Sequence, residues 1–363
     1  MLVVDLSAVD MDQVLHAQRT AQLKRVPKGA EVFLSAGCSG RWYFDWIEEA
    51  YGAVRHHIGL EYYSPRPDDL PDNVTWIANT VGNMEAVGAD SVDLVFSGQN
   101  LEHLWADDVV GFLCESNRVL RSGGLLVMDS PNRIVTAGLN WSHPEHTVEF
   151  TAAEAAELCA LAGFEVDASV GLWRCIVDGE LRPRPPVDEL DLIERTVGGL
   201  DAPDESFVWW IEARRVADPD RAALEARVEA IFEPAWRERL NRVIPLAGDV
   251  SDDGTIITSH EGTEGAVFFG PHTPLPAGRY RVEFDVTSLH TVDASPGWCD
   301  VNSNDGGLAV EHLPPMAEGE TVTVGLDVSL ANLVFGVEFR LVSNGTAQLR
   351  SPLGVRFSEV PAG

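Results

Sequence analysis

Basic side chains are scarce in this sequence. Its 363 residues include 26 lysines and arginines against 57 aspartates and glutamates, a formal net charge of −31 at pH 7. The only lysines are Lys24 and Lys28, and no basic cluster interrupts the acidic sequence. A negative field of this size repels the phosphates of nucleic acids and of anionic membranes. The composition therefore argues against a nucleic-acid partner and favours a neutral or small-molecule substrate.

Long apolar runs and closely paired cysteines are also missing. No apolar stretch approaches the roughly 18 residues of a membrane-spanning helix, and the start of the chain lacks the basic stretch and apolar core of a secretory signal. The five cysteines are scattered without CxxC spacing, which indicates free thiols and neither a zinc site nor a disulfide framework. We therefore predict a cytoplasmic protein with no membrane span and no bound metal.

The chain is longer than one hydrophobic core usually supports, so we predict two domains. From residue 10 to about 217, apolar stretches of strand length alternate with stretches of helical periodicity. This alternation predicts a mostly parallel sheet covered by helices on both faces. The predicted strands are 31–36, 56–61, 73–77, 92–97, 124–130, 164–173 and 207–215. The predicted helices are 10–25, 41–52, 107–121 and 151–162, the last opened by a capping-box pattern at Thr151 and Glu154.

The pattern changes in the last third of the chain. Residues 181–206, which include "RPRPP", predict an insertion or loop, and a helix that Pro234 should bend is predicted over 221–243. Beyond it, short alternating stretches such as "GRYRVEFDV" (278–286) and "FGVEFRLVS" (335–343) predict an all-β sandwich of jelly-roll type. We therefore predict an α/β domain over 1–217, a linker helix over 218–244 and a sandwich domain over 245–363.

The turn after the first predicted strand, "LSAGCSGRW" (34–42), is rich in small residues. Gly37 and Gly40 would let the backbone approach a ligand, with a helix N-terminus directed at it. By itself the turn is equally well explained as a tight bend. Glu61 follows Gly37 by 24 residues and ends the second predicted strand, where a carboxylate can accept both hydroxyls of a ribose. This favours an adenosine-containing ligand, with an exposed glutamate at a strand end as the alternative.

Four stretches of the first domain carry a family resemblance. They are "VFLSAGCSGRW" (32–42), "GLE" (59–61), "GNMEAVGADSVDLVFSGQNLEHL" (82–104) and "ESNRVLRSGGLLVMDSPN" (115–132). Together they resemble the class I methyltransferases that use S-adenosylmethionine, over roughly residues 30 to 217. The resemblance implies a Rossmann-like sheet of seven mostly parallel strands, whose antiparallel final strand would be "FVWWIEARR" (207–215). It also implies S-adenosylmethionine as the cofactor.

The resemblance assigns cofactor-binding roles residue by residue. The matched positions are Gly37 and Gly40 beside the methionine part, Glu61 on the ribose, Asn83 and Met84 around the adenine, and Ser97 at the end of the fourth strand. The acid that is common at the position of Ser35 is absent, which removes one anchor for the methionine amino group. Ser39 and Trp42 stand where a dinucleotide-binding GxGxxG motif requires glycine, so an NAD-dependent oxidoreductase is disfavoured.

A hydroxyl acceptor needs a general base or a metal to remove its proton. The segment after the fifth predicted strand, together with "LEHL", supplies the candidates. We predict catalytic roles for Asp129, His143, His146 and His103, and substrate contacts for Asn132 and Trp141. Metal ligation by the pair His143 and His146 is a weaker alternative, and purely structural histidines remain a further one.

These features predict an S-adenosylmethionine-dependent O-methyltransferase that acts on a sugar hydroxyl of a glycan or glycoconjugate. The sandwich is similar in texture to modules of enzymes that decorate bacterial polysaccharides, and Trp298 could stack on a sugar ring. A sandwich used only for packing or for assembly of a homo-oligomer is an equal alternative. Methylation of a small non-sugar metabolite and a noncatalytic scaffold in a polysaccharide-synthesis complex are the other functions that the sequence leaves open.

Overall fold

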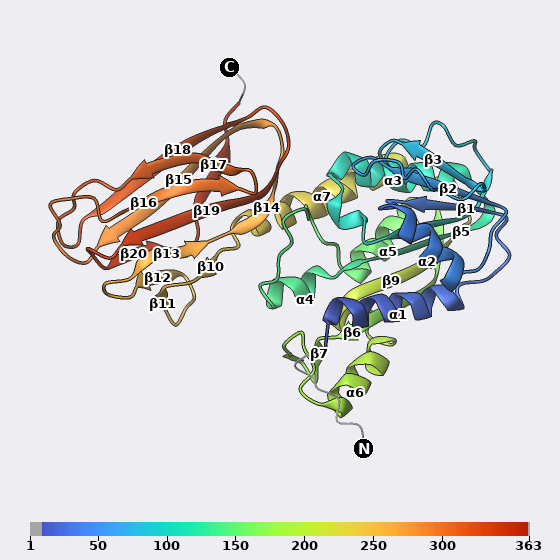
Figure 1. Ribbon diagram of the computed structural model, residues 1–363, viewed down its shortest axis with the longest axis horizontal. Helices are drawn as coiled ribbons and strands as arrows, with labels where there is room; N and C mark the ends of the chain where they lie inside the picture. Colours follow the sequence, from blue (N-terminus) through green and yellow to red (C-terminus); the bar gives the residue numbers. More distant parts are fainter. Residues whose placement is uncertain (1–8, 362–363) are drawn as a thin grey trace. The chain divides into compact units, whose positions relative to one another are not determined.

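The computed structural model describes residues 9–361, which form two compact units (Figure 1). The first unit extends as far as residue 141 and continues over 148–233. The second unit takes the short segment 142–147 and the chain from residue 234 onward. In the described part of the chain, no helix is both long and apolar enough to cross a membrane.

A seven-stranded sheet in the order β3-β2-β1-β4-β5-β9-β6 forms the centre of the first unit. Its strands are β1 (Val32–Ala36), β2 (His56–Glu61), β3 (Val74–Ala78), β4 (Val92–Gly98), β5 (Leu120–Pro131), β6 (Phe164–Arg174) and β9 (Ser206–Arg215). The first five strands pair in parallel, and β9 runs antiparallel to both of its neighbours. The predicted Rossmann-like sheet is therefore confirmed, including its antiparallel final strand.

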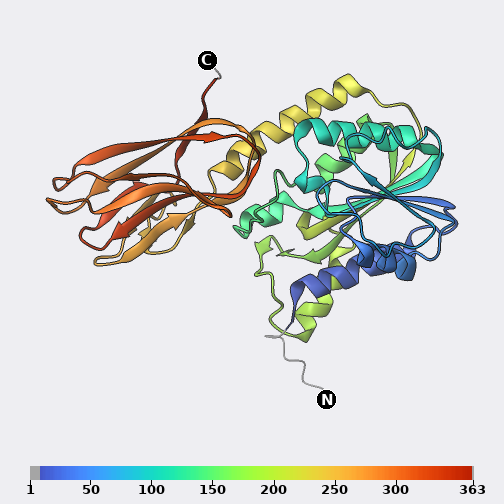
Figure 2. The same cartoon turned by 45° about the horizontal axis from the view of Figure 1, so that its top comes forward.

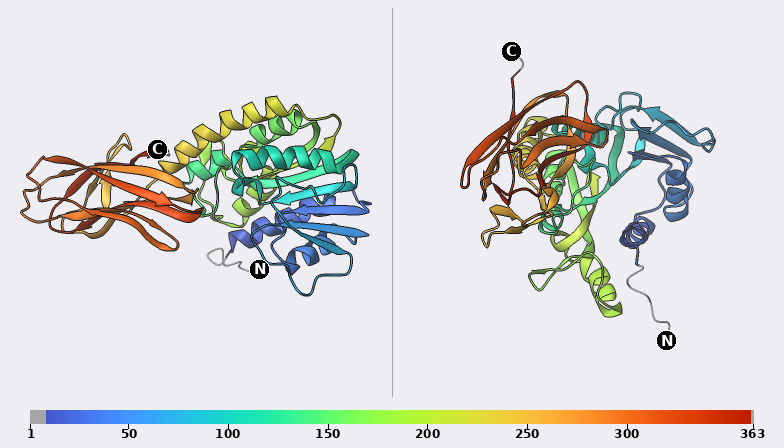
Figure 3. Two further views of the ribbon diagram at one scale, coloured as in Figure 1. Left: turned by 90° about the horizontal axis from the view of Figure 1, so that it is seen from above. Right: turned by 60° about the vertical axis from the view of Figure 1, so that its left-hand side comes forward.

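Helices cover both faces of this sheet, with α1 and α2 on one face and α3 and α5 on the other (Figure 3). The helices are α1 (Met11–Arg25), α2 (Arg41–Ala50), α3 (Ala106–Val119), α4 (Arg133–Gly138), α5 (Ala152–Leu161), α6 (Glu189–Gly199) and α7 (Arg221–Leu240). Two short 3-10 turns lie at Leu101–His103 and Pro203–Glu205. The capping box of α5 forms as predicted, since Thr151 Oγ1 accepts from Glu154 N at 3.1 Å and the Glu154 carboxylate accepts from Thr151 N at 2.9 Å. The long helix α7 stays helical through Pro234 (Figure 2).

The insertion before the last strand is more ordered than the sequence indicated. Residues 181–206 contain α6, and the hairpin of β7 (Ile176–Val177) and β8 (Glu180–Leu181) precedes it. The Asp188 side chain caps α6 by accepting from Asp191 N at 2.8 Å. The helix is anchored by Arg195, which is buried and donates to the carbonyl oxygen of Arg174 at 2.6 Å. The anchor of α6 is thus an arginine, and the prediction of a loop, made from the "RPRPP" stretch, missed this helix.

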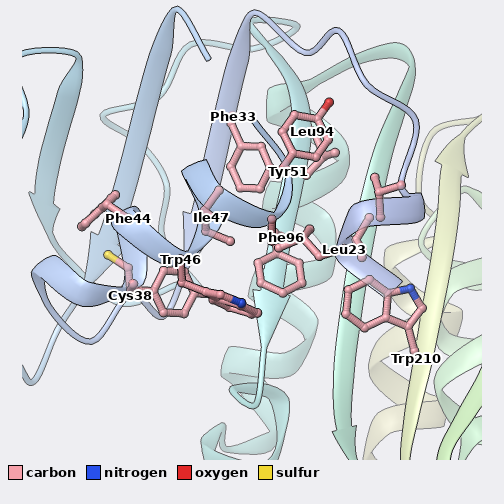
Figure 4. Packing of buried hydrophobic residues seen from close by; sticks show 14 residues of the cluster. Leu23, Phe33, Cys38, Phe44, Trp46, Ile47, Tyr51, Leu94, Phe96 and Trp210 are labelled. Atoms are coloured by element: carbon pink, nitrogen blue, oxygen red, sulfur yellow. The ribbon is translucent and has the colours of Figure 1, made fainter. Parts of the chain in front are cut away.

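A large aromatic cluster fills the space between the sheet and the helices α1 and α2 (Figure 4). Phe33 and Phe96 come from the sheet, and Phe44 and Ile47 come from α2. All four are at most 2% exposed. Because burying one such side chain contributes ~1.5–3 kcal/mol, this cluster fixes the loop between β1 and α2 at the carboxyl edge of the sheet.

The second unit is a sandwich of two antiparallel sheets, as predicted. One sheet contains β10 (Ile244–Pro245), β13 (Glu264–Phe269), β14 (Pro271–Leu275), β16 (Gly297–Ser303), β17 (Gly306–His312) and β19 (Val334–Asn344). The other contains β11 (Gly248–Val250), β12 (Ile256–Ser259), β15 (Gly278–Ser288), β18 (Thr321–Leu330), β20 (Leu349–Pro352) and β21 (Arg356–Glu359). The predicted alternation along β15 is confirmed, because every second side chain from Tyr280 to Val286 is buried. Phe268 and Phe284 stack between the two sheets with their ring centres 6.2 Å apart.

Candidate active site

The strand order reverses between β1 and β4, so the loops at the carboxyl ends of these strands border the crevice where open α/β sheets bind ligands. Gly37 and Gly40 in the loop after β1 have φ values of +79° and +112°, a region that favours glycine. A Cβ atom on Gly37 would lie 2.6 Å from Oδ1 of Asn100 in the loop after β4. Glycine at position 37 therefore lets the two loops meet at this edge.

Glu61 lies at the carboxyl end of β2, next to the glycine loop. The backbone N–H of Gly37 donates to the carbonyl oxygen of Leu60 at 2.9 Å, which joins the two strand ends. Glu61 Oε1 accepts from the backbone N–H groups of Tyr63 at 2.8 Å and of Ser64 at 3.0 Å. These bonds hold the carboxylate in one orientation. The structure thus brings the predicted ribose acid and the predicted glycine loop together.

Ser35, which replaces the expected acid, pairs with a histidine that sequence reasoning missed. Its hydroxyl lies 2.8 Å from Nε2 of His57 on β2, and both residues are buried. Burial, with a smaller contribution from His56, lowers the pKa of His57 to about 3. The pair is therefore neutral. His57 leads directly into the apolar stretch Ile58–Leu60 of the strand, and that position was the available signal.

The two residues predicted to surround the adenine differ in what they offer a ligand. Asn83 is exposed, and its Oδ1 accepts from the backbone N–H of Glu85 at 3.0 Å, which orients the side-chain amide. A carbonyl oxygen has two lone pairs, so this atom can accept a further hydrogen bond. Met84 has a fully buried side chain, and its backbone N–H donates to Glu115 Oε2 at 2.9 Å. Met84 thus anchors the turn that presents Asn83.

The carboxyl ends of β4 and β5 meet at a buried ion pair. Asp129 is completely buried and binds the guanidinium of Arg19 on α1 through both carboxylate oxygens. Gln99 has a φ of +53°, uncommon for a residue other than glycine, and its backbone N–H donates to Asp129 Oδ1 at 2.8 Å. Ser97 is buried and accepts from Asn100 Nδ2 at 3.1 Å. Asp129 is therefore occupied in holding α1 and the loop after β4.

Arg19 is the second functional candidate that sequence reasoning missed. It lies four residues after Leu15 and four before Leu23, on the buried face of α1. Its guanidinium also lies over the ring of Trp46, 5.1 Å from the ring centre. A basic residue on the apolar face of a predicted helix needs a buried acidic partner. The spacing of Arg19 from Leu15 and Leu23 was therefore the signal that could have identified it.

The predicted catalytic histidines belong to different parts of the chain. His143 and His146 lie in the segment 142–147 of the second unit, with their rings 4.5 Å apart. The carbonyl oxygen of His143 accepts from Arg239 at 2.8 Å, and that of His146 accepts from Thr273 Oγ1 at 3.0 Å. These bonds fix the backbone of the segment within that unit.

His103 belongs to the first unit and ends the 3-10 turn Leu101–His103 after β4. It is partly exposed and follows the loop that contacts Gly37. The catalytic roles of His103, His143 and His146 stay predictions.

The two predicted substrate contacts have different surroundings. Asn132 is completely buried, accepts from Ile134 N to cap α4, and donates from Nδ2 to the carbonyl oxygens of Asp204 and Ser206 at 2.9 and 3.1 Å. These bonds tie the side chain to α4 and to the chain around the start of β9, and its contact with a substrate stays a prediction. The short helix that it caps was not predicted. Trp141 is half-buried and packs edge-on against Phe207 at 5.2 Å.

On the sandwich, Trp298 lies among polar groups. Its indole N–H donates to Asp300 Oδ2 at 3.0 Å, and Asp300 accepts from Arg340 Nε and Nη2 at 2.7 and 3.0 Å. Neighbouring residues on a strand point to opposite faces, and Cys299 and Val301 between them face the core. Trp298, Asp300 and their arginine partner therefore lie on the outer face of the sheet.

Comparison with known proteins places the first unit's sequence among methyltransferases. Residues 34–128 match the model of a family described as a methyltransferase domain. A probable S-adenosylmethionine-dependent methyltransferase of Mycolicibacterium smegmatis is 34% identical over 193 residues, which cover 52% of this chain and 72% of the relative. A second probable methyltransferase of this kind, from Mycobacterium tuberculosis, is 44% identical over 85 residues, covering 23% of this chain and 30% of the relative.

Among solved structures, an S-adenosylmethionine-dependent methyltransferase from Mesorhizobium loti is similar to this chain with a TM-score of 0.40 and 16% identity. The similarity covers 57% of this chain and 100% of that one.

Proposed function

The chain belongs to the S-adenosylmethionine-dependent methyltransferases, and from this premise we propose that it methylates the hydroxyl oxygen of a neutral sugar. Its cofactor is S-adenosylmethionine. The observation that carries the choice of a sugar is the outer face of the sandwich, where Trp298 lies beside the Asp300–Arg340 pair. An aromatic ring next to fixed polar groups suits a sugar, whose ring has an apolar face and a rim of hydroxyls.

The residues at the carboxyl edge of the sheet fit this cofactor. Gly37 and Gly40 have backbone conformations that favour glycine, and we assign them to the methionine part. Glu61 would accept the ribose hydroxyls, because its carboxylate is fixed beside the glycine loop. We assign the adenine amino group to Asn83 Oδ1 and give Met84 the role of anchoring the turn.

When bound, S-adenosylmethionine supplies a methyl group carried on a sulfonium, which makes the methyl carbon electrophilic. The acceptor oxygen would take up this methyl group, and the electron pair of the carbon–sulfur bond would stay on sulfur. The hydroxyl proton passes to a general base. Ser97 and Gln99 at the end of β4 would border the reacting atoms, and the Arg19–Asp129 pair would hold the Gln99 loop in place.

We assign the general base to a histidine rather than to Asp129. Both carboxylate oxygens of Asp129 already accept hydrogen bonds from Arg19, and Oδ1 also accepts from the backbone N–H of Gln99. Asp129 is also fully buried. His103, His143 and His146 are the remaining predicted bases. Replacing each histidine by alanine in turn identifies the base. Only the variant that lacks the base should lose methyl transfer while its affinity for the cofactor stays unchanged.

Calorimetric titration with S-adenosylhomocysteine tests the cofactor site first, with NAD as the ligand control. We expect Glu61→Ala to weaken binding by about tenfold or more, since a ribose loses its charged hydrogen-bond acceptor. Glu31→Ala is the matched control, because Glu31 is an exposed acid at the opposite end of the sheet, just before β1. Equal affinities of wild type and Glu61→Ala would contradict the ribose assignment.

Methyl transfer from labelled S-adenosylmethionine to neutral oligosaccharides, amines and carboxylic acids then tests the acceptor. We expect the label on the oligosaccharide as an ether that resists mild alkali, whereas a methyl ester would be hydrolysed. Trp298→Ala should lower turnover of the oligosaccharide and leave cofactor affinity unchanged. Label found only on nitrogen or on a carboxylate would reject the proposed O-methyl transfer to a sugar.

A further inference from the structure

The turn over residues 83–87 is fastened to α3 through its backbone. Met84 N donates to Glu115 Oε2 at 2.9 Å. In the opposite direction, the guanidinium of Arg118 donates from Nη2 to the carbonyl oxygen of Met84 at 2.8 Å and from Nη1 to that of Val87 at 2.9 Å. Three backbone groups of one short turn are thus held by two side chains of a single helix.

The two side chains also hold each other. Arg118 donates from Nε and Nη2 to the two carboxylate oxygens of Glu115, each at 2.7 Å. The hydrogen bond from Arg118 is the largest cause that lowers the pKa of Glu115 below its ordinary value. A bidentate pair of this kind fixes the orientation of both the guanidinium and the carboxylate, which a single hydrogen bond does not. The Glu115–Arg118 pair is therefore a rigid frame that holds the turn over residues 83–87.

The chain just before residues 83–87 also packs closely against α3, at Gly111. A Cβ atom on Gly111 of α3 would lie 2.7 Å from the carbonyl oxygen of Gly82. The outer side of the turn faces an open depression of about 530 Å³ that is lined by Asn83, Glu85 and Arg118 among others. The position of Asn83 therefore depends on the contacts that the turn makes with α3.

We propose that Glu115 and Arg118 are positioning residues that set the turn so that Asn83 recognises the adenine amino group. This inference rests on the proposed function, which places the adenine of the cofactor at Asn83. The bond from Glu85 N fixes the orientation of the Asn83 amide, and Oδ1 has a second lone pair that can accept a hydrogen bond from the adenine amino group. A recognition group must be held to within about 0.5 Å of its productive position, so loosening the frame costs selectivity as well as affinity.

Two ligands separate this role from a general loss of structure. S-adenosylhomocysteine carries the adenine amino group, and S-inosylhomocysteine carries an oxygen in its place. We expect wild type to prefer S-adenosylhomocysteine by about tenfold, because the carbonyl oxygen that replaces the amino group cannot donate to Asn83 Oδ1. In Arg118→Met, which keeps an unbranched side chain but lacks the guanidinium, we expect weaker binding and the loss of most of this preference. Glu115→Gln, which keeps an oxygen acceptor for Met84 N, should lose less of this preference than Arg118→Met.

Calorimetric titration of the full chain measures both dissociation constants, and thermal unfolding without ligand confirms that each variant is folded. Arg121→Met is the matched control, since Arg121 pairs with Asp93 away from the turn and exposed pairs contribute little. Unchanged preference in both Arg118→Met and Glu115→Gln, with wild type discriminating, would overturn the inference while leaving the proposed function intact. Failure of wild type itself to bind S-adenosylhomocysteine would instead overturn the proposed function. If Arg118→Met does not fold, Glu115→Gln decides the question.

Discussion

Ser35 and His57 show how one position changes the charge at the cofactor edge of the sheet. The family resemblance leads one to expect an acid at position 35, and the structure has a serine hydroxyl bound to a buried, neutral imidazole. Burial lowers the pKa of His57 to about 3, so the pair carries no charge at neutral pH. With the methionine part at the loop after β1, as we propose, its amino group would meet less negative charge than the family pattern provides.

The depressed pKa of His57 predicts that its contribution to stability is lost in acid. Its ordinary value is 6.5, and the folded value is about 3. Between these values the unfolded chain binds a proton that the folded protein does not. The free energy of unfolding therefore falls as the pH falls from about 6.5 toward about 3, by up to about 1.4 kcal/mol per pH unit.

Urea unfolding of wild type and His57→Asn at pH 7 and pH 5 measures this effect. Asparagine keeps a polar partner for Ser35 but does not titrate in this range. We expect the advantage of wild type over the variant to shrink by about 2 kcal/mol at pH 5. A difference between the two proteins that is the same at both pH values would show that His57 takes up a proton equally in the folded and unfolded states.

At the scale of single elements, α1 is tied to the sheet by one buried ion pair. Arg19 donates to both oxygens of Asp129, although 110 residues separate the two in sequence. The pair also lies against Gly98, where a Cβ atom would be 2.4 Å from Arg19 Nη2. The N-terminal helix therefore borders the carboxyl edge of β4 and β5, where the proposed reaction takes place.

Removing one member of this ion pair should lower the free energy of unfolding more than removing both members. Arg19→Met leaves Asp129 buried without its guanidinium, and we expect a loss of about 3–5 kcal/mol in the free energy of unfolding. The double variant Arg19→Met/Asp129→Leu leaves no buried charge and should recover part of that loss. Urea denaturation of the three proteins measures the difference. A double variant less stable than Arg19→Met would show that Asp129 stabilises the fold mainly through Gln99.

The elements of the first unit were predictable to the extent that their residues face an apolar core. The sequence placed the seven strands and the helices α1, α2, α3 and α5 within a few residues. In α6, Leu190, Ile193 and Val197 also lie at helical spacing, but they are exposed and a buried arginine holds the helix. Apolar spacing alone does not show what anchors a helix, and the prolines of "RPRPP" favoured a loop over this segment.

At the scale of the whole molecule, the acidic excess is the dominant electrostatic feature. The 57 acidic side chains outnumber the 26 basic ones by 31. Like charges on a compact surface repel one another, and the repulsion opposes folding. The same field favours neutral acceptors over anionic ones, in line with the proposed sugar substrate.

Screening should therefore stabilise the protein at neutral pH. We expect the melting temperature at pH 7.5 to rise by a few degrees, on the order of 1 kcal/mol of stability, between low salt and about 0.5 M NaCl. Near the isoelectric point of about 4.5 the net charge vanishes, so the same addition of salt should have little effect. Scanning calorimetry at both pH values makes the comparison, and an equal effect at both would assign the stabilisation to ion binding or to solvent exclusion instead of screening.

The sequence by itself determined the features that local pattern and composition control. Strand and helix periods, the turn chemistry of Gly37 and Gly40, the placement of Glu61 at a strand end and the acidic net charge are all properties of short segments or of composition. They depend on backbone sterics and on the alternation of side chains, which act within a few residues. For this reason the order of the two kinds of fold could be predicted, whereas the family and the cofactor were predicted from the resemblance of four stretches to the class I methyltransferases.

Only the tertiary structure decided which polar side chains form hydrogen bonds that hold the fold together. Asn132 donates to the carbonyl oxygen of Ser206, Asp129 binds Arg19, and Arg118 holds the turn that contains Asn83. Each of these partnerships joins elements that are distant in sequence. A buried polar group must find a partner wherever the packed chain brings one, and that partner depends on the whole fold rather than on the spacing of residues.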